Sequence, residues 1–274
     1  MVESLKNKVH ITNNWNIIEK GLSPKKSSDI DISSSKSFYR FMSLETFKYM
    51  LSGSFRINNP IKWKDPYENL FVNGNYDAIN YLKPSVYAAC FTKEANSEAS
   101  WKVYTMGKEP CVRVEFDMIN FIGTICLADI FENTLSLYIG DVSYDLPDNS
   151  LRALGKKTTK YHALAFPPDF SNDNFVDLLL LKRKSFKYEQ ESRLIILNDG
   201  AQDDYMTLYY SPEMFLSFVK SVQIDPNCEP EDAQILISEF QHRISSWKKP
   251  LYHYNPEIIH STLYQKISPV IVEK

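Results

Sequence analysis

Residues 188–196 read Tyr-Glu-Gln-Glu-Ser-Arg-Leu-Ile-Ile, and this stretch is the most informative part of the sequence for the fold and the site. If the stretch enters a β-strand, Glu189, Glu191 and Arg193 project from one face, because side chains alternate along a strand. Leu194 and Ile196 then project from the other face. The two carboxylates lie roughly 7 Å apart, two residues of strand rise, so each raises the other's pKa. Such a surface either orients a sugar or a nucleophile, or is a solvated strand face with an ordinary Glu–Arg ion pair.

Apolar and alternating runs on both sides of this stretch predict the rest of the fold. The strands expected are residues 38–42, 55–58, 86–91, 111–116, 193–197 and 221–224. Helices are expected over 44–51, 100–105 and 175–184, with another beginning at Pro230. The helix over 175–184 would end on three cations, which suit the negative end of a helix dipole. Because strands and helices alternate without regular βαβ units, we expect an α+β fold with one mixed sheet and flanking helices.

The first 37 residues are polar and rich in Ser and Lys, so they bury too little apolar surface to order themselves unaided. We expect residues 1–37 to form a flexible or peripheral arm. Residues 38–274 contain no convincing internal boundary and no repeat, so they are expected to form a single globular domain.

Composition excludes several classes of protein. The net charge is -3 with 43% hydrophobic residues, which argues against a global positive field for nucleic acid and against a disordered chain. The four cysteines form no CxxC pair, and the start of the chain does not resemble a secretion signal. No apolar run approaches the roughly 18 residues of a membrane span. We therefore expect a soluble, reduced, cytoplasmic protein without a membrane partner.

Motifs for several common chemistries are absent from the sequence. There is no GxGxxG turn, no HExxH or Cys/His metal spacing and no GxSxG elbow. Dinucleotide-binding Rossmann enzymes, zinc hydrolases and α/β-hydrolases are therefore not indicated.

Three other segments have both a structural and a functional interpretation. Asp65 and Glu68 fit a helix capping box with Pro66 at the first helical position, but they could also be metal ligands of a nuclease, together with Glu115, Asp117 or Glu191. Trp101 and Tyr104 are core or rim aromatics, or they stack a nucleobase or nicotinamide ring. The basic run 182–187 is either a cluster of cations at the C-terminal end of a helix or a stretch that contacts phosphates.

Six short motifs, taken in order, resemble a bacterial family known as a domain of unknown function. They are Tyr39-Arg40-Phe41, Asn59-Pro60 with Asp65-Pro66-Tyr67-Glu68, Cys90-Phe91-Thr92, Trp101-Lys102-Val103-Tyr104, Val112-Arg113-Val114-Glu115-Phe116 and Tyr188-Glu189-Gln190-Glu191-Ser192-Arg193. The resemblance covers the chain from about Phe38 to its C-terminal strand and helix. It implies no chemistry by itself.

A second resemblance does imply chemistry. The sequence is similar to the Arg-Ser-Glu signature of the ADP-ribosyltransferases. In that signature an Arg lies on a first strand, a Ser or Thr on a middle strand and a Glu-x-Glu pair at a late strand. The resemblance implies a split sheet of that type, with Glu191 as the catalytic glutamate and Glu189 orienting the nucleophile. It implies that NAD is the substrate, held by Arg40 and Thr92, with Tyr39, Trp101 and Tyr104 as further binding residues.

Three functions from different classes follow. The first is an ADP-ribosyltransferase or NAD glycohydrolase, acting as a toxin or phage-defence effector, for which no metal is expected. Its acceptor is a protein or nucleic acid that the sequence leaves open, and an antitoxin or regulatory partner is a further expectation. The second is a metal-dependent nuclease using Asp65, Glu68 and Glu191, and the third is a non-catalytic interaction or sensor protein. Arg193 is assigned to the site without a defined role.

Overall fold

The computed structural model describes residues 8–11, 37–63, 65, 68, 86–104, 110–127, 135–146, 172–198 and 203–264. Its main feature is a ten-stranded sheet in the order β1-β6-β9-β4-β2-β5-β11-β12, with β3 and β10 attached beside β4. The strands are β1 (Lys8–Ile11), β2 (Phe38–Ser43), β3 (Ser54–Asn58), β4 (Val86–Thr92), β5 (Cys111–Phe116), β6 (Leu135–Asp141), β9 (Glu191–Asn198), β10 (Tyr205–Tyr209), β11 (Val219–Ile224) and β12 (Glu257–His260). β11 and β12 run parallel, and the other described pairs of this sheet are antiparallel.

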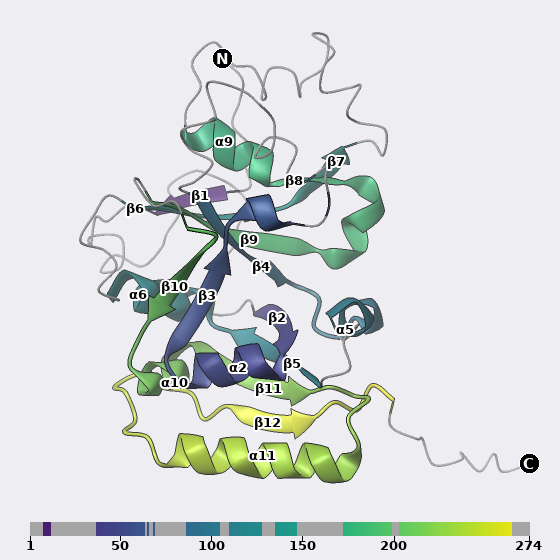
Figure 1. The fold of residues 1–274 in the computed structure, drawn as a ribbon, viewed down its shortest axis with the longest axis vertical. Helices are drawn as coiled ribbons and strands as arrows, with labels where there is room; N and C mark the ends of the chain where they lie inside the picture. The colour runs from purple at the N-terminus through teal and green to yellow at the C-terminus, as the bar shows by residue number, and fades with distance from the viewer. Residues whose placement is uncertain are drawn as a thin grey trace, which may run out of the picture.

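Helices lie on both sides of this sheet, as Figure 1 shows. They are α2 (Leu44–Leu51), α5 (Glu98–Tyr104), α6 (Met118–Leu127), α9 (Asn172–Leu179), α10 (Phe215–Phe218) and α11 (Pro230–Ser245), with the short 3-10 helices η1 (Pro60–Lys62), η4 (Lys184–Glu189) and η5 (Pro212–Met214). A second, two-stranded sheet joins β7 (Ser143–Leu146) to β8 (Leu181–Arg183). The mixed sheet with flanking helices confirms the α+β class.

β9 lies inside the sheet, between β4 and β6, where both of its edges are paired. Its side chains from Glu191 to Leu197 are all buried, those on the charged face included. The expected solvated strand face is therefore wrong, because α9 and β8 cover the face that carries the charges. A strand buried on both sides has to neutralise its charged groups internally, since their hydration is lost.

The main hydrophobic core lies on the other face of the sheet. It is built largely from aromatic rings of α2, α6, α10 and α11 against β5, such as Phe121 and Phe218 at 5.1 Å between ring centroids. The ends of α2 follow the expected signals: the Ser43 side chain accepts from the Thr46 N–H at 3.2 Å, and Gly53 follows the helix with φ +83°. Local capping chemistry was thus sufficient to place this helix.

The sheet divides beside β4. β2 reaches β4 through the pair Tyr39↔Thr92, and β3 reaches it through Asn58↔Ala88. The β3–β10 ribbon therefore leaves the path that continues through β2 and β5, as Figure 1 shows.

The prediction of a helix over 175–184 is wrong for its C-terminal half. α9 ends at Leu179, where the N–H of Leu180 still donates to Val176 O at 3.1 Å, and the chain then enters β8. The carbonyl of Leu180 accepts from the N–H of Ser143 at 2.7 Å, so pairing with β7 replaces the next helical turn. A continuous apolar run does not by itself distinguish a buried helix from a buried strand. As a result Lys182 and Arg183 are strand residues.

The polar arm contributes an element that its composition did not predict. Lys8–Ile11 form β1, antiparallel to β6 in the register Lys8↔Gly140 to Ile11↔Leu137. Residues 1–7 and 12–36 lie outside the described part of the chain. In the described ranges no helix is both long enough and apolar enough to cross a membrane.

Candidate functional site

A row of polar residues crosses the sheet on the face opposite the main core. The register aligns Glu191 with Thr92, Thr92 with Tyr39, and Tyr39 with Glu115, on four neighbouring strands. Residues in register project to the same side of a sheet, so these four side chains belong to one surface, which we call the site face. Arg193, two residues beyond Glu191 on β9, projects to this face as well.

Arg193 is fully buried and binds two carboxylates. Its Nε donates to Glu191 Oε1 at 2.8 Å, and its Nη2 donates to Glu191 Oε2 at 3.0 Å and to Glu68 Oε2 at 2.6 Å. Its Nη1 donates to the carbonyl of Leu179, and the Trp63 ring lies 4.3 Å from the guanidinium carbon. The guanidinium thus holds Glu191 in a fixed two-point geometry and links it to the segment that contains Glu68.

Lys182 completes a buried ion cluster that we define as Glu68, Lys182, Glu189, Glu191 and Arg193. Its Nζ lies 3.0 Å from Glu68 Oε1, 3.0 Å from Glu191 Oε2 and 2.5 Å from Glu189 Oε2, and its side chain is only 8% exposed. Three carboxylates therefore share one ammonium group and one guanidinium group.

The two glutamates of the expected Glu-x-Glu pair have opposite electrostatic environments. Burial by itself raises the pKa of Glu191, but Arg193 and then Lys182 outweigh burial and lower that pKa to about 2. Burial also raises the pKa of Glu189, where the attraction of Lys182 offsets it only in part. Glu191 is thus held as an anion while Glu189 takes up a proton more readily than an ordinary glutamate.

Glu189 reaches this cluster by a route that strand alternation did not predict. It is the last residue of η4, not a residue of β9, and Gln190 follows it with φ 43° in the left-handed region. This turn reverses the chain so that Glu189 returns to Lys182 beside Glu191. The Thr92 hydroxyl donates to the carbonyl of Glu189 at 2.6 Å and holds the turn against β4.

A small cavity opens over the two glutamates. Its volume is about 20 Å³, and it is lined by Phe91, Thr92, Ser100, Val103, Tyr188, Glu189 and Glu191. A cavity of this size holds about one water molecule. Val103 on α5 and Tyr188 on η4 are each 48% exposed, so these two side chains form its outer wall.

The residues expected to bind NAD do not all lie on the site face. Arg40 projects to the core side, where its guanidinium lies 4.9 Å from the Phe55 ring, so it is not brought together with Glu191. Trp101 is 1% exposed and packs edge-on against Phe41 at 4.8 Å, the packing role that its helical spacing left open. The Tyr39 ring lies on the site face beneath the Arg113 guanidinium at 4.8 Å. The side chain of Tyr104 lies outside the described residues.

The acidic residues of the nuclease alternative separate into two groups. Glu68 and Glu191 converge on Lys182, and Asp65 pairs with Arg183 at 3.0 Å nearby. Glu115 and Asp117 lie elsewhere: Glu115 accepts from Ser221 Oγ at 2.6 Å, and Asp117 accepts from the Tyr254 hydroxyl at 2.5 Å. Within the ranges that the structure describes, no group of three or more His, Cys, Asp or Glu is placed to hold a metal ion.

The capping box expected at Asp65 and Glu68 is described only at these two positions, because residues 64, 66, 67 and 69–85 lie outside the described part. The N–H of Glu68 donates to the carbonyl of Asp65 at 3.1 Å, which is a turn. Both carboxylates nevertheless bind cations from β8 and β9, so the segment also has an electrostatic role in the site.

Sequence reasoning missed Lys182 and Trp63 as members of the site. Lys182 was assigned to a helix end because a cation suits that end of the helix dipole, and no local signal joined it to Glu68, which lies more than 100 residues earlier. Trp63 precedes the Asp65–Glu68 segment by two residues and offers no local signal of its own.

Comparisons with protein-family models, with curated proteins and with solved structures gave no match. The resemblance to a domain family of unknown function and the resemblance to the ADP-ribosyltransferases therefore stay predictions.

Proposed function

We propose that this chain cleaves the bond between nicotinamide and ribose in NAD, as an ADP-ribosyltransferase-like enzyme or an NAD glycohydrolase. The observation that carries the proposal is that Glu189 and Glu191, joined by Lys182, line the same cavity. When the surroundings of two neighbouring carboxylates move their pKa values apart, one carboxylate can stay an anion while the other accepts and releases a proton.

Glu191 is the fixed anion of this mechanism. When the bond from C1′ of the ribose to nicotinamide breaks, nicotinamide leaves as a neutral molecule with the bonding electron pair, and positive charge develops on the ribose. A carboxylate held in place by Arg193 stabilises that charge where it develops, without reorganising during the reaction. Because its pKa is lowered to about 2, Glu191 stays ionised at neutral pH.

Glu189 is the proton carrier. A hydroxyl group of the acceptor, or water, forms the new bond to C1′ and releases its proton to the Glu189 carboxylate. Burial raises the pKa of this carboxylate, which favours proton uptake relative to Glu191. The cavity has room for about one water molecule beside it, which is the position of the nucleophile in the hydrolytic form of the reaction.

The rest of the dinucleotide is assigned to the polar row through Thr92 and Tyr39, because this row continues from Glu191 along the same face. Arg40 is left out of the mechanism, since it projects from the opposite face. Entry of the nicotinamide ring requires Val103 and Tyr188 to separate, because the cavity between them is smaller than the ring. An ADP-ribosyltransferase-like fold, which the division of the sheet beside β4 supports, is part of the same proposal.

The test is to incubate the purified protein with NAD, with and without bacterial lysate, and to measure nicotinamide release. We expect Glu191→Gln to lose release by at least about 100-fold, the typical loss when one electrostatic stabiliser is removed. Glu189→Gln should fold and lose most of the activity. Glu231→Gln changes an exposed glutamate on α11 and should behave as wild type.

Two outcomes would contradict the proposal. One is release that is equal in Glu191→Gln and wild type, and the other is no release together with no change in melting temperature on adding NAD. Degradation of DNA or RNA that EDTA and Asp65→Ala both abolish would instead favour the nuclease. Radiolabelled NAD in the lysate arm identifies the acceptor, and with it any role as a toxin or phage-defence effector.

A further inference from the structure

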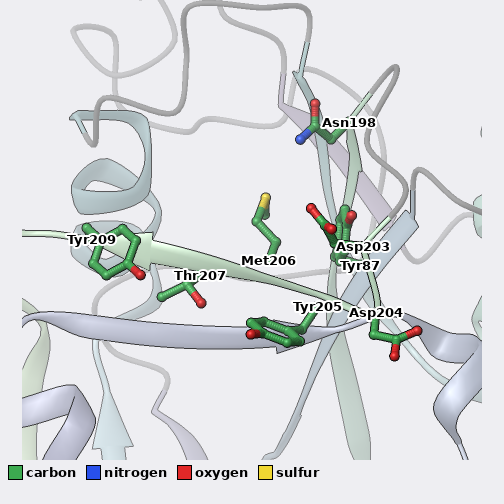
Figure 2. A pocket seen from close by; sticks show the side chains of 8 residues that line it. All are labelled: Tyr87, Asn198, Asp203, Asp204, Tyr205, Met206, Thr207 and Tyr209. Carbon is green, nitrogen blue, oxygen red and sulfur yellow. The ribbon is translucent and has the colours of Figure 1, made fainter.

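A second, larger pocket lies at the far end of β9 from the ion cluster. Its volume is about 640 Å³, and the residues that line it are Tyr87, Asn198, Asp203, Asp204, Tyr205, Met206, Thr207 and Tyr209, all drawn in Figure 2. Asn198 is seven residues beyond Glu191, so the pocket lies about 23 Å from the candidate active site at 3.3 Å per residue. A pocket of this volume is large enough for a ligand of several residues or a small molecule.

The charged residues that line this pocket are acidic, and its aromatic residues are tyrosines. Among its eight lining residues none is basic, two are aspartates and three are tyrosines. Two cations of the chain itself are already bound to this wall: Lys62 Nζ lies 2.9 Å from Asp204 Oδ2, and the Arg56 guanidinium lies 3.4 Å from the centre of the Tyr205 ring. Asp203 is exposed and supplies a second carboxylate beside the Lys62–Asp204 ion pair. The chemistry that suits this wall is therefore a guanidinium or ammonium group.

β10, which supplies half of the lining residues, has a second edge. Its register with β3 runs from Tyr205↔Asn58 to Tyr209↔Ser54, and the flanking backbone bonds join Asp204 O to Asn59 N at 2.9 Å and Gly53 O to Tyr210 N at 2.8 Å. In an antiparallel ladder hydrogen-bonded pairs alternate with pairs that point outward. The backbone N–H and C=O groups of the even-numbered residues of β10 therefore face β3. Those of Tyr205, Thr207 and Tyr209 point to the opposite edge of β10.

Within the described ranges β10 pairs only with β3. In Figure 2 β10 has β3 along one edge, and Met206 points away from that edge. An outward row of backbone donors and acceptors is a template for one more strand. This edge and the charged wall coincide, since the three outward residues all line the pocket.

We propose that an extended basic peptide segment of a partner protein adds as a strand to the outer edge of β10 and places a Lys or Arg side chain in the pocket. Backbone hydrogen bonds to Tyr205, Thr207 and Tyr209 give the segment its alignment. Asp203 selects its charge, since Asp204 is already paired with Lys62. Basic residues at every second position reach the same wall, because side chains alternate along a strand. The surface is separate from the ion cluster and does not depend on NAD chemistry.

The experiment measures binding of a fluorescent peptide of alternating arginine and threonine to the full-length protein by fluorescence anisotropy. We expect at least about a tenfold loss of affinity when citrulline replaces arginine, because citrulline keeps the shape and removes the charge. A similar loss is expected in Asp203→Asn. Asp232→Asn, an exposed aspartate on α11, is the matched control and should bind as wild type.

A second variant tests strand addition separately. Thr207→Pro removes one outward N–H without removing a bond to β3, and proline is tolerated on edge strands. We expect Thr207→Pro to weaken binding of the peptide and to leave binding of agmatine, a small guanidinium probe, unchanged. The proposal is overturned if the peptide does not bind at about 1 mM, if citrulline or Asp203→Asn leaves its affinity unchanged, or if agmatine binds as tightly as the peptide.

Discussion

At the scale of the residue, Lys182 is the group on which the candidate site depends most. Glu68, Glu189 and Glu191 all contact its Nζ, and only Glu68 and Glu191 also contact Arg193. Burial disfavours its charged form, but Glu191 and then Glu68 more than compensate, so that its pKa is raised and it stays an ammonium group. A buried cation of this kind prevents the carboxylates from repelling each other.

We expect Lys182→Met to lower the free energy of unfolding by about 3 to 5 kcal/mol, because it leaves buried carboxylates without their shared partner. Urea denaturation followed by circular dichroism measures the change. Lys184→Met is the matched control: Lys184 is exposed on η4, so its removal should change stability by less than about 0.5 kcal/mol. Equal effects of the two substitutions would show that the cluster does not stabilise the fold.

At the scale of the element, the ion cluster requires a close approach between β6 and the chain that joins α9 to β8. Gly140 is paired with Arg193 across β6 and β9, and a Cβ at this position would lie 2.3 Å from Leu180 Cδ1. Leu180 is fully buried and lies between Leu179, whose carbonyl binds Arg193, and the segment that carries Lys182. The absence of a side chain on Gly140 therefore allows β8 to bring its lysine to β9.

Gly140→Ala is expected to destabilise the protein by about 1 to 3 kcal/mol, the usual cost of adding a methyl group to a packed core. If the cause is the contact with Leu180, the double variant Gly140→Ala/Leu180→Ala should lose less stability than the sum of the two single variants. Urea denaturation of all four proteins gives the coupling energy. Additive effects would show that Gly140 acts through its backbone and not through this contact.

The elements also show where local sequence patterns are sufficient. Ser43 and Gly53 place α2, and strict alternation places β5 within the residues expected for it. β8 was mistaken for the end of a helix, because whether Leu181 and Lys182 continue α9 depends on β7, which is some 40 residues earlier in the chain. Pairing with a distant strand outweighs the local helical preference.

At the scale of the whole molecule, β1 covers one end of the sheet. It pairs with β6 along four residues, and without β1 the strand β6 would be the terminal strand of a nine-stranded sheet. Exposed sheet edges promote association between copies, because their backbone groups pair with any available strand.

We therefore expect a variant that lacks residues 1–11 to self-associate more strongly than the full chain. Light scattering coupled to size-exclusion chromatography at several protein concentrations measures this. A variant lacking only residues 1–7 keeps β1 and is the control. An identical mass for both variants at every concentration would show that β1 does not protect this edge.

The sequence by itself determined the α+β class, the position of α2, α5 and α11, and the fact that Glu191 and Arg193 share a strand face, because these follow from capping residues and from side-chain periodicity. Only the tertiary structure decided that β9 is buried on both faces, that Glu68 and Lys182 join Glu191, and that Arg40 projects to the opposite side. The physical reason is that burial and charge pairing depend on strands and turns far apart in the chain. Once charged groups are removed from water, their partners are whichever opposite charges the fold brings within hydrogen-bonding distance.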